Sequence, residues 1–405
     1  MKGDRRRQFV WSFLRIFVRP IFRLFFGYKA INFKLEKNKP YVVLSNHVAQ
    51  IDPIYLAISF KRKINFIAYA GVCYGKYQKL LHRYFAPIPK TKGKSDLMTI
   101  RESLKVIKNN GIVGLFPSGD CSFSGVESHI DKSIIKFLRM MKADLLLYRL
   151  DGIYGTSPRW GRKRNKGKAR GQVKKVLTVD EMNALSDEEL YNTIIEVIGG
   201  NNLSYIEGNL YKGKYCAEYL ERTLYVCPDC GEVGTMFSHR EAFTCLKCGY
   251  QVTYQPDLHF KLVKGKNYLP TVNDWYNYCI DALKEKDKND QFPNGQSIFV
   301  DNFEYLKTEW LEKSEQGYQV KHNISFEDGK ISLYRDKFMI ESKDGKEIIN
   351  LPVKSSKVIF HGKKSLVIYN EEFTYTIRGY DRFCGMKYLH LVNEVFKNEI
   401  IEQND

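Results

Sequence analysis

The stretch Tyr41-Val42-Val43-Leu44-Ser45-Asn46-His47-Val48-Ala49-Gln50-Ile51-Asp52-Pro53 predicts a buried strand, a short loop and the start of a helix. Its first five residues are mostly apolar, which is typical of a short strand covered on both faces. Pro53 suits the first helical position, and Asp52 suits the N-cap before it. A buried strand that leads directly into a helix indicates an α/β fold.

His47 and Asp52 form a candidate base-and-orienter pair within this stretch. Two side chains five positions apart on a regular helix would point about 140° away from each other. A His47 that lies in the loop is free to turn back toward Asp52, and a carboxylate there can hold the imidazole while it accepts a proton. For the pair alone, the simpler role of Asp52 as a helix cap stays open.

A second apolar strand, GIVGLFPSGD at 111–120, ends in a Pro-Ser-Gly turn. Together the two segments resemble the glycerolipid acyltransferases, the 1-acylglycerol-3-phosphate acyltransferase family, whose signatures are Asn-His-x4-Asp and Phe-Pro-Glu-Gly-x-x-Ser. The matching positions are Asn46, His47 and Asp52 in the first motif, and Phe116, Pro117, Gly119 and Ser122 in the second. The resemblance covers about residues 1–200 and implies a mixed sheet with helices.

The departures from the family pattern gather where the family holds the phosphate of its acceptor. Ser118 stands in place of the glutamate, and Cys121 stands where the family often has arginine. Lys90 is the nearest equivalent of an arginine in the acceptor-binding segment. The resemblance therefore predicts the reaction type better than it predicts the acceptor.

The resemblance implies a membrane-associated O-acyltransferase of phospholipid biosynthesis. His47 would be the general base, which typically contributes ~10²–10⁴-fold, and Asp52 would orient it. Backbone N–H groups near the turn are candidate donors to the oxyanion. The substrate-binding residues implied are Asn46, Lys90, Phe116, Pro117, Ser118 and Gly119. Cys121 is a poor candidate nucleophile, because nothing in the sequence supplies a base for it.

The expected donor is acyl-coenzyme A or acyl carrier protein, and the leading acceptor is a lysophospholipid such as lysophosphatidic acid. A different lysolipid or a glycolipid is the alternative acceptor. A catalytically inactive membrane adaptor is a further alternative, because the departures at Ser118 and Cys121 are consistent with lost acceptor binding.

The net charge of +18 implies anionic partners. Nine Lys or Arg and no acidic residue lie between Arg159 and Lys175, which predicts either a solvated Gly-rich loop or a basic rim for an anionic lipid or donor. Nucleic acid is an unlikely partner, because the basic residues do not gather around the cysteine motif described below.

The N-terminal segment, residues 1–28, predicts an amphipathic helix that lies in a membrane interface. Arg15, Arg19 and Arg23 are four positions apart and share one face, and apolar residues recur on the other. A spanning helix is disfavoured, since each central arginine would cost roughly 2.5–3.5 kcal/mol. We expect peripheral or monotopic association with the cytoplasmic face of a membrane. A core helix packed on the domain is the alternative.

Two Cys-x-x-Cys knuckles, each followed by Gly and separated by fourteen residues between Cys230 and Cys245, have the spacing of a four-thiolate zinc site. The expected ligands are Cys227, Cys230, Cys245 and Cys248, in a zinc ribbon at 220–256 with flanking strands at 222–226 and 250–254. Four ligands close the coordination sphere, so the zinc would be structural. Disulfides are the alternative, but the other five cysteines show no pairing pattern.

The remaining landmarks divide the chain. The acyltransferase domain is expected at 29–200, after the interfacial helix at 1–28, and a helical connector at 257–312 is expected to follow the ribbon. Short alternating strands broken by turns predict a β-rich domain at 315–405, closed by a helix that starts near Gly385. This arrangement resembles a pleckstrin-homology-type barrel, and a small β-sandwich is the alternative. Lipid or partner binding would be its role.

Overall fold

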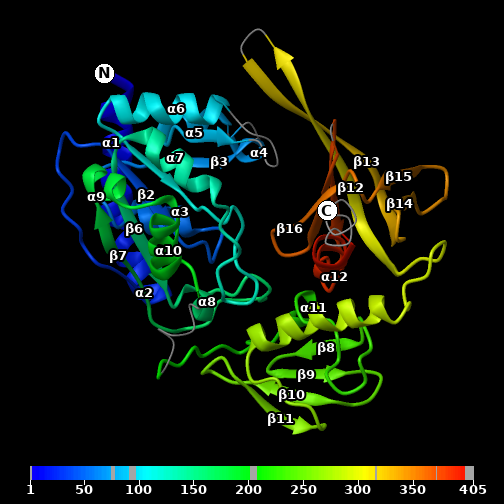
Figure 1. The fold of residues 1–405 in the computed structure, drawn as a ribbon. Helices are drawn as coiled ribbons and strands as arrows, with labels where there is room; N and C mark the ends of the chain where they lie inside the picture. The colour runs from blue at the N-terminus through cyan, green and yellow to red at the C-terminus, as the bar shows by residue number, and fades with distance from the viewer. Residues whose placement is uncertain are drawn as a thin grey trace. The chain divides into compact units, whose positions relative to one another are not determined.

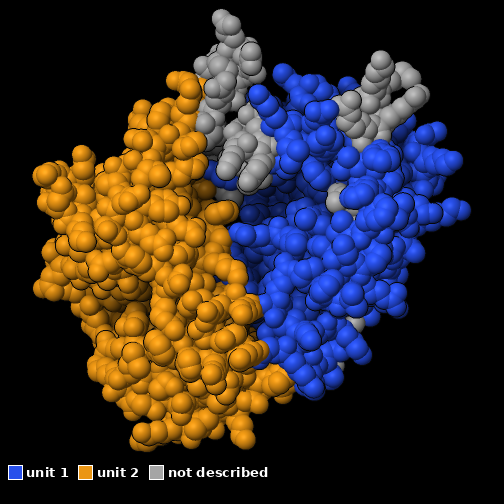
Figure 2. Space-filling model, turned by 180° about the vertical axis from the view of Figure 1, so that it is seen from behind, with its two compact units in different colours: residues 1–159, 164–213 blue, residues 160–163, 214–405 orange. Residues whose placement is uncertain are grey.

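The computed structural model of the protein describes residues 2–73, 78–90, 97–200, 208–314, 317–370 and 372–396. The chain folds into two compact units, shown in different colours in Figure 2. Unit 1 comprises residues 1–159 and 164–213, and unit 2 comprises residues 160–163 and 214–405. The short segment 160–163 therefore belongs to unit 2, although residues of unit 1 flank it.

Unit 1 is built on a seven-stranded mixed sheet with the order β1-β7-β6-β2-β5-β3-β4 (Figure 1). The strands are β1 (Tyr28–Ala30), β2 (Tyr41–Ser45), β3 (Asn65–Tyr69), β4 (Ile88–Lys90), β5 (Ile112–Leu115), β6 (Asp144–Asp151) and β7 (Ala169–Leu177). β2 lies parallel to β5 and β6, while β7 runs antiparallel to β6. The predicted α/β architecture is confirmed, and the apolar stretch at 41–45 is the central strand, with every residue buried.

Helices pack on both faces of this sheet. One face is covered by α6 (Leu97–Lys108), α7 (Ser133–Met141) and α10 (Asp187–Ile198), whose apolar residues share a core with alternate residues of β2 and β6. Tyr148, next to the core residue Leu147 on β6, points to the opposite face because strand side chains alternate. There its ring packs against Phe60, just after α3 (Asp52–Ala57), and its hydroxyl lies 2.9 Å from that of Tyr28. The shorter helices of unit 1 are α4 (Ala70–Cys73), α5 (Gln78–Tyr84), α8 (Ile153–Thr156) and α9 (Val179–Ala184).

The N-terminal helical segment consists of α1 (Lys2–Phe13), a π-helical turn η1 (Leu14–Val18) and α2 (Arg19–Phe26). Trp11 and Phe22 are its anchors: the Trp11 indole donates to the carbonyl of Phe60, and the Phe22 ring meets Tyr55 edge-on. Seven other apolar side chains are exposed, namely Phe9, Phe13, Ile16, Phe17, Ile21, Leu24 and Phe25. In the described part of the chain, no helix is both long and apolar enough to cross a bilayer.

Part of the basic segment at 159–175 is a strand and not a loop. Its second half forms β7, which pairs with β1 and β6. Gly171 allows this pairing, since a Cβ atom there would lie 2.0 Å from the Tyr28 hydroxyl and 2.1 Å from that of Tyr148. The glycine that suggested a flexible loop is therefore required for close packing.

The first part of unit 2 is a four-stranded antiparallel sheet with the order β11-β10-β9-β8. Its strands are β8 (Met236–His239), β9 (Ala242–Cys245), β10 (Gln251–Tyr254) and β11 (Phe260–Lys264). The strand predicted at 250–254 is β10, but the one predicted at 222–226 is not formed. A 3-10 turn, η3 (Leu220–Arg222), and an isolated bridge at Val226 take its place. Helix α11 (Val272–Lys288) packs on the sheet through the buried Trp275, whose indole donates to the carbonyl of Val226.

The second part of unit 2 is a seven-stranded antiparallel sheet with the order β15-β14-β13-β12-β18-β17-β16. The strands are β12 (Phe299–Ser314), β13 (Gly317–Leu333), β14 (Lys337–Ser342), β15 (Ile348–Pro352), β16 (Lys357–His361), β17 (Ser365–Tyr369) and β18 (Thr374–Gly379). The chain ends in α12 (Met386–His390) and the π-helical turn η4 (Leu391–Phe396). The β-rich character is confirmed, and β12 begins at Phe299, inside the range expected for the connector. Assignment to the pleckstrin-homology class stays a prediction.

Candidate active site

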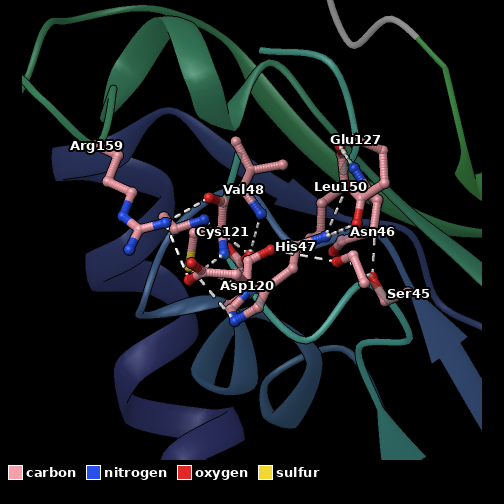
Figure 3. A network of polar contacts seen from close by, with 12 residues as sticks. Ser45, Asn46, His47, Val48, Asp120, Cys121, Glu127, Leu150 and Arg159 are labelled. Carbon is pink, nitrogen blue, oxygen red and sulfur yellow. Dashed lines mark hydrogen bonds and ion pairs between the residues drawn. The ribbon is translucent and has the colours of Figure 1, made fainter. Parts of the chain in front are cut away.

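Two loops that leave the same edge of the sheet of unit 1 form the candidate site (Figure 3). β2 and β5 are parallel neighbours, with Leu44 paired to Leu115, so their carboxyl ends coincide. The loop 46–51 follows β2, and the turn 116–122 follows β5. Segments about 70 residues apart in the sequence are thereby brought into contact, because they follow adjacent strands.

Within the first loop, His47 turns back onto Asp52. The Nδ1 atom of His47 lies 2.9 Å from Oδ2 of Asp52, and the Asp52 side chain is fully buried. The same oxygen accepts the backbone N–H groups of Val48 at 2.7 Å and Ala49 at 2.9 Å. Ile51, not Asp52, is the N-cap, and Asp52 is the first residue of α3. The carboxylate therefore organises the loop before the helix and does not cap the helix after it.

The His47 ring is packed between side chains of the second loop. The Phe116 ring stacks on it with a centroid distance of 4.2 Å. The Cys121 sulfur lies 3.4 Å from Nε2 and 3.6 Å from Nδ1. A sulfur in line with the Nε2 lone pair would be much farther from Nδ1, so Cys121 packs beside the ring. Burial also raises the pKa of Cys121 well above its usual range, which keeps the thiol protonated.

Glu127 holds the backbone of His47. The His47 N–H donates to both Glu127 carboxylate oxygens, at 3.0 and 3.1 Å, and the His47 carbonyl accepts the Ser122 N–H at 2.9 Å. The Ser118 hydroxyl also bonds to Glu127, and burial raises the pKa of this carboxyl to about 8. Glu127 was missed by sequence reasoning. The sequence pointed to it only indirectly. Ser118 replaces the glutamate of the second family motif, so an acid from elsewhere in the chain could have been sought.

The Asn46 side chain forms hydrogen bonds that join two strands of the sheet. Its side-chain amide donates to the Leu150 carbonyl at 2.9 Å and accepts the Leu150 N–H at 2.8 Å. This pair of bonds fixes the end of β2 against the end of β6. The described contacts give Asn46 a scaffolding position directly before His47.

The guanidinium of Arg159 lies next to Cys121, the position at which the family often has an arginine. One Nη atom donates to the Cys121 carbonyl at 2.6 Å and pairs with Asp120 at 2.9 Å, and the buried guanidinium lies 3.9 Å above the Phe123 ring. The sequence did not single it out for this site, because it lies 38 residues from Cys121. These contacts hold the second loop in place.

The turn at Pro117, Ser118 and Gly119 is closed by a bond from the Gly119 N–H to the Phe116 carbonyl at 3.1 Å. Gly119 has a φ of +71°, which favours glycine at this position. Because this N–H is used within the turn, it is a weaker oxyanion donor than the sequence suggested. Lys90 ends β4, three strands from β2 in the sheet order, or roughly 14 Å away at the usual strand spacing. It shares the edge of the sheet but does not join the cluster around His47.

Comparison with known proteins bears on this region. Residues 30–148 match the family model described as Acyltransferase. This part of the chain is thus similar to acyltransferase domains. No curated protein matches the sequence significantly. Among solved structures, the chain is similar to the 1-acyl-sn-glycerophosphate (LPA) acyltransferase PlsC from Thermotoga maritima, with 19% sequence identity, a TM-score of 0.41, and coverage of 47% of this chain and 78% of that chain.

The matched range, residues 30–148, includes both motifs. His47, Asp52, Phe116 and Ser118 come together with Glu127 within it, while Arg159 lies beyond its end. The domain thus unites a histidine–carboxylate pair with a partly exposed ring, since 17% of the His47 side chain is accessible.

A second candidate site lies in unit 2, where the four predicted cysteines converge. One sulfur from each of Cys227, Cys230, Cys245 and Cys248 lies within 4.8 Å of all the others. The N–H groups of the glycines after each knuckle donate to the first cysteine carbonyl, at 2.9 Å for Gly231 and 3.0 Å for Gly249. Both glycines have positive φ angles. Four converging thiols fit a tetrahedral metal site and leave no position for a substrate.

Proposed function

We propose that the acyltransferase domain transfers a fatty acyl group from a thioester donor to the hydroxyl of a lysophospholipid resembling 1-acylglycerol-3-phosphate. The observation that carries this proposal is the 2.9 Å contact between Asp52 and Nδ1 of His47. A carboxylate at Nδ1 keeps the proton on that nitrogen and leaves Nε2 as the base. The ring is also partly exposed, so a substrate can reach it.

The reaction balances with His47 as the only proton carrier. Nε2 takes the proton of the acceptor hydroxyl while the oxygen attacks the thioester carbonyl carbon. The tetrahedral intermediate then collapses, the C–S bond breaks, and the thiolate takes the proton from Nε2. The products are an ester and a free thiol, of coenzyme A or acyl carrier protein. No acyl-enzyme is needed, which agrees with the sideways packing of Cys121.

Membrane association forms part of the proposal. Seven outward-facing apolar residues on α1, η1 and α2 include Leu24, 78% exposed, and Phe9, 71% exposed. A contiguous apolar stripe of this kind is typical of a surface that meets a bilayer. Arg19, on the arginine face of this segment, donates to the Ala30 carbonyl and to Asn32 Oδ1 and is thereby held in place. We place the protein at the cytoplasmic face of a membrane as a peripheral or monotopic protein.

The four-cysteine cluster supports a structural zinc ion as the second part of the proposal. Thiolates are preferred ligands of zinc, and four of them complete its coordination. Zinc there would fix the two knuckles relative to each other and take no part in acyl transfer.

One observation favours a different acceptor. Ser118 and Cys121 carry no charge, and Arg159 is paired with Asp120. The turn after β5 is therefore poorly suited to a phosphate monoester, and a lysolipid or glycolipid without that group is the second candidate. The intact His47–Asp52 pair argues against an inactive adaptor.

The test uses the purified full-length protein in detergent micelles with palmitoyl-coenzyme A and a panel of acceptors, namely 1-oleoylglycerol-3-phosphate, lysophosphatidylglycerol and a monoacyl glycolipid. Products are identified by mass spectrometry. We expect His47→Ala to lower kcat by about 10²–10⁴-fold, and Asp52→Asn to lower it less. The control is His239→Ala, which changes an exposed histidine of unit 2. Equal transfer by wild type and His47→Ala would refute the mechanism.

A further inference from the structure

A pocket between α2 and β1 lies outside the candidate active site. Its volume is about 330 Å³, and Arg19, Arg23, Lys29 and Asn32 line it, with the buried Tyr28 among its walls. All of these residues belong to unit 1. Three of the lining residues are basic and none is acidic.

The cations of the pocket are arranged to receive an anion. Arg19 is anchored by its bonds to the Ala30 carbonyl and to Asn32 Oδ1, which use two of its five N–H donors. The side chains of Arg23 and Lys29 are exposed, and neither side chain makes a hydrogen bond or ion pair with any residue that the structure describes. One fixed guanidinium and two adaptable cations are suited to a phosphate group.

Positive charge near the pocket is incompletely balanced. The Nε atom of Arg15 is buried and has no hydrogen-bond partner. Burial and the neighbouring Arg19 lower the pKa of Arg15. An anion close to Arg19 would offset this repulsion.

The surroundings of the pocket indicate where the anion comes from. Leu24 and Phe25, beside Arg23 on α2, are 78% and 68% exposed, and Ile31 of the pocket wall is also exposed. Apolar side chains that enter a bilayer hold neighbouring cations at the level of the lipid phosphates. A soluble phosphate ester would gain nothing from the apolar residues, whereas a phospholipid meets both groups together.

We propose that this pocket binds the phosphate of an anionic phospholipid and thereby docks unit 1 on the membrane. The proposal rests on the membrane association proposed above. It adds a lipid-binding site separate from the acceptor site, which involves different residues at the carboxyl edge of the sheet.

The experiment is vesicle co-sedimentation of the full-length protein at constant ionic strength. One set of vesicles is pure phosphatidylcholine, and the other contains 30 mol% phosphatidylglycerol. The test variant is Arg23→Gln/Lys29→Gln. The matched control is Lys108→Gln/Lys136→Gln, which removes two exposed lysines of unit 1 on α6 and α7. A further arm adds soluble glycerol-1-phosphate as a competitor.

We expect wild type to bind the anionic vesicles more tightly than the neutral ones. The pocket variant should lose most of that difference, roughly tenfold in partition coefficient, and keep its binding to neutral vesicles. The control variant should change little, and millimolar glycerol-1-phosphate should not displace the protein. Acyl transfer in micelles should persist in the pocket variant.

Three results would overturn the inference. The first is an unchanged preference for anionic vesicles in the pocket variant. The second is an equal loss in the control variant, which would indicate general electrostatic attraction. The third is displacement by glycerol-1-phosphate, which would identify a soluble phosphoester as the ligand. Absence of wild-type binding to either vesicle would refute both this site and the membrane association, while the micelle assay would still test acyl transfer separately.

Discussion

At the scale of single residues, the position of His47 is determined by contacts that come from both loops. Asp52 binds its ring nitrogen, Phe116 and Cys121 pack against its ring, and Glu127 binds its backbone N–H. A catalytic base whose side chain is already fixed loses little conformational entropy when substrate binds, and it is held in the orientation that proton transfer requires. Glu127 is thus a positioning residue and does not itself need to touch substrate.

Replacement of Glu127 should reduce acyl transfer and change the pH dependence of stability. The folded-state pKa of about 8 lies above the ordinary 4.5, so ionisation of Glu127 destabilises the folded state progressively between pH 4.5 and 8. In Glu127→Gln this loss is absent. The melting temperature of the variant relative to wild type should therefore rise as pH increases from 4.5 to 8, although kcat falls roughly tenfold.

Differential scanning calorimetry across this pH range measures the effect, with Glu102→Gln as the control on a partly exposed carboxylate that pairs with Lys105. Asp52 and Arg149 are the other charged groups that act on Glu127. A melting-temperature difference that is constant with pH would contradict the prediction.

Burial of His390 should lower the free energy of unfolding of the protein in acid. Its ring is buried, its Nδ1 lies 2.7 Å from the Tyr225 hydroxyl, and its Nε2 has no partner. Burial lowers the pKa of His390 to about 3 from 6.5, so the unfolded chain binds a proton more readily than the folded one. Unfolding free energy should fall as pH drops from 6.5 toward 3.

Urea unfolding followed by the fluorescence of unit 2 tryptophans measures this effect. In His390→Gln the acid dependence should become shallower, while the exposed control His259→Gln should keep the wild-type slope. Parallel slopes for His390→Gln and wild type would show that another group is responsible.

At the scale of elements, the N-terminal helical segment has two apolar sides with different tasks. One side anchors it to the domain through Trp11 and Phe22, both nearly inaccessible, and the other side is the exposed stripe. The alternatives of a core helix and an interfacial helix are therefore compatible, because the same segment packs on the domain and presents an apolar face outward.

Substitutions on the exposed stripe should reduce vesicle binding, whereas substitutions on the anchoring side should reduce stability. Phe13→Ser/Phe17→Ser removes two exposed rings that are tilted against each other with their centroids 4.6 Å apart. Stability should therefore change little, while binding to neutral vesicles falls at least tenfold. Trp11→Ala removes a buried ring and the bond to Phe60, which should cost about 3–5 kcal/mol of unfolding free energy. Thermal melts and vesicle co-sedimentation distinguish the two. A stripe variant that binds vesicles like wild type would exclude this face as the membrane contact.

At the scale of the whole molecule, the two candidate sites belong to different compact units. The histidine–carboxylate pair lies in unit 1, and the four-cysteine cluster lies in unit 2. The segment 160–163 is part of unit 2 through the Trp160 carbonyl, which accepts Arg222, and the Gly161 carbonyl, which accepts Lys363. Because the cysteine cluster lies in unit 2, loss of a bound metal should destabilise unit 2 before it affects unit 1.

Metal removal provides the test at this scale. The full-length protein should contain about one zinc per chain. Chelation should accelerate hydrogen exchange at least tenfold within the knuckles at 227–231 and 245–249 and leave β2 and β5 unchanged. Cys227→Ser should reproduce the chelated state. A protein without bound metal whose knuckles exchange slowly would refute the zinc proposal.

Local patterns accounted for much of what could be predicted. Strand β2 follows from a short apolar run, the knuckles follow from cysteine and glycine spacing, and His47 and Asp52 are close enough in the chain to be paired by one loop. Each of these depends on residues within about ten positions. The predicted strand at 222–226 failed because a 3-10 turn satisfies its backbone instead.

The sequence alone determined that unit 1 would be α/β, that His47 would lie beside Asp52, and that four cysteines would form one cluster. The tertiary structure decided that Glu127 and Arg159 hold the candidate site, that part of the basic segment is a strand, and that Arg23 and Lys29 share a pocket. The reason is physical. The spacing of residues within one helix, strand or loop can be read directly from the sequence. Contacts between distant residues depend on which strands become neighbours, and that order follows from the packing of the whole sheet.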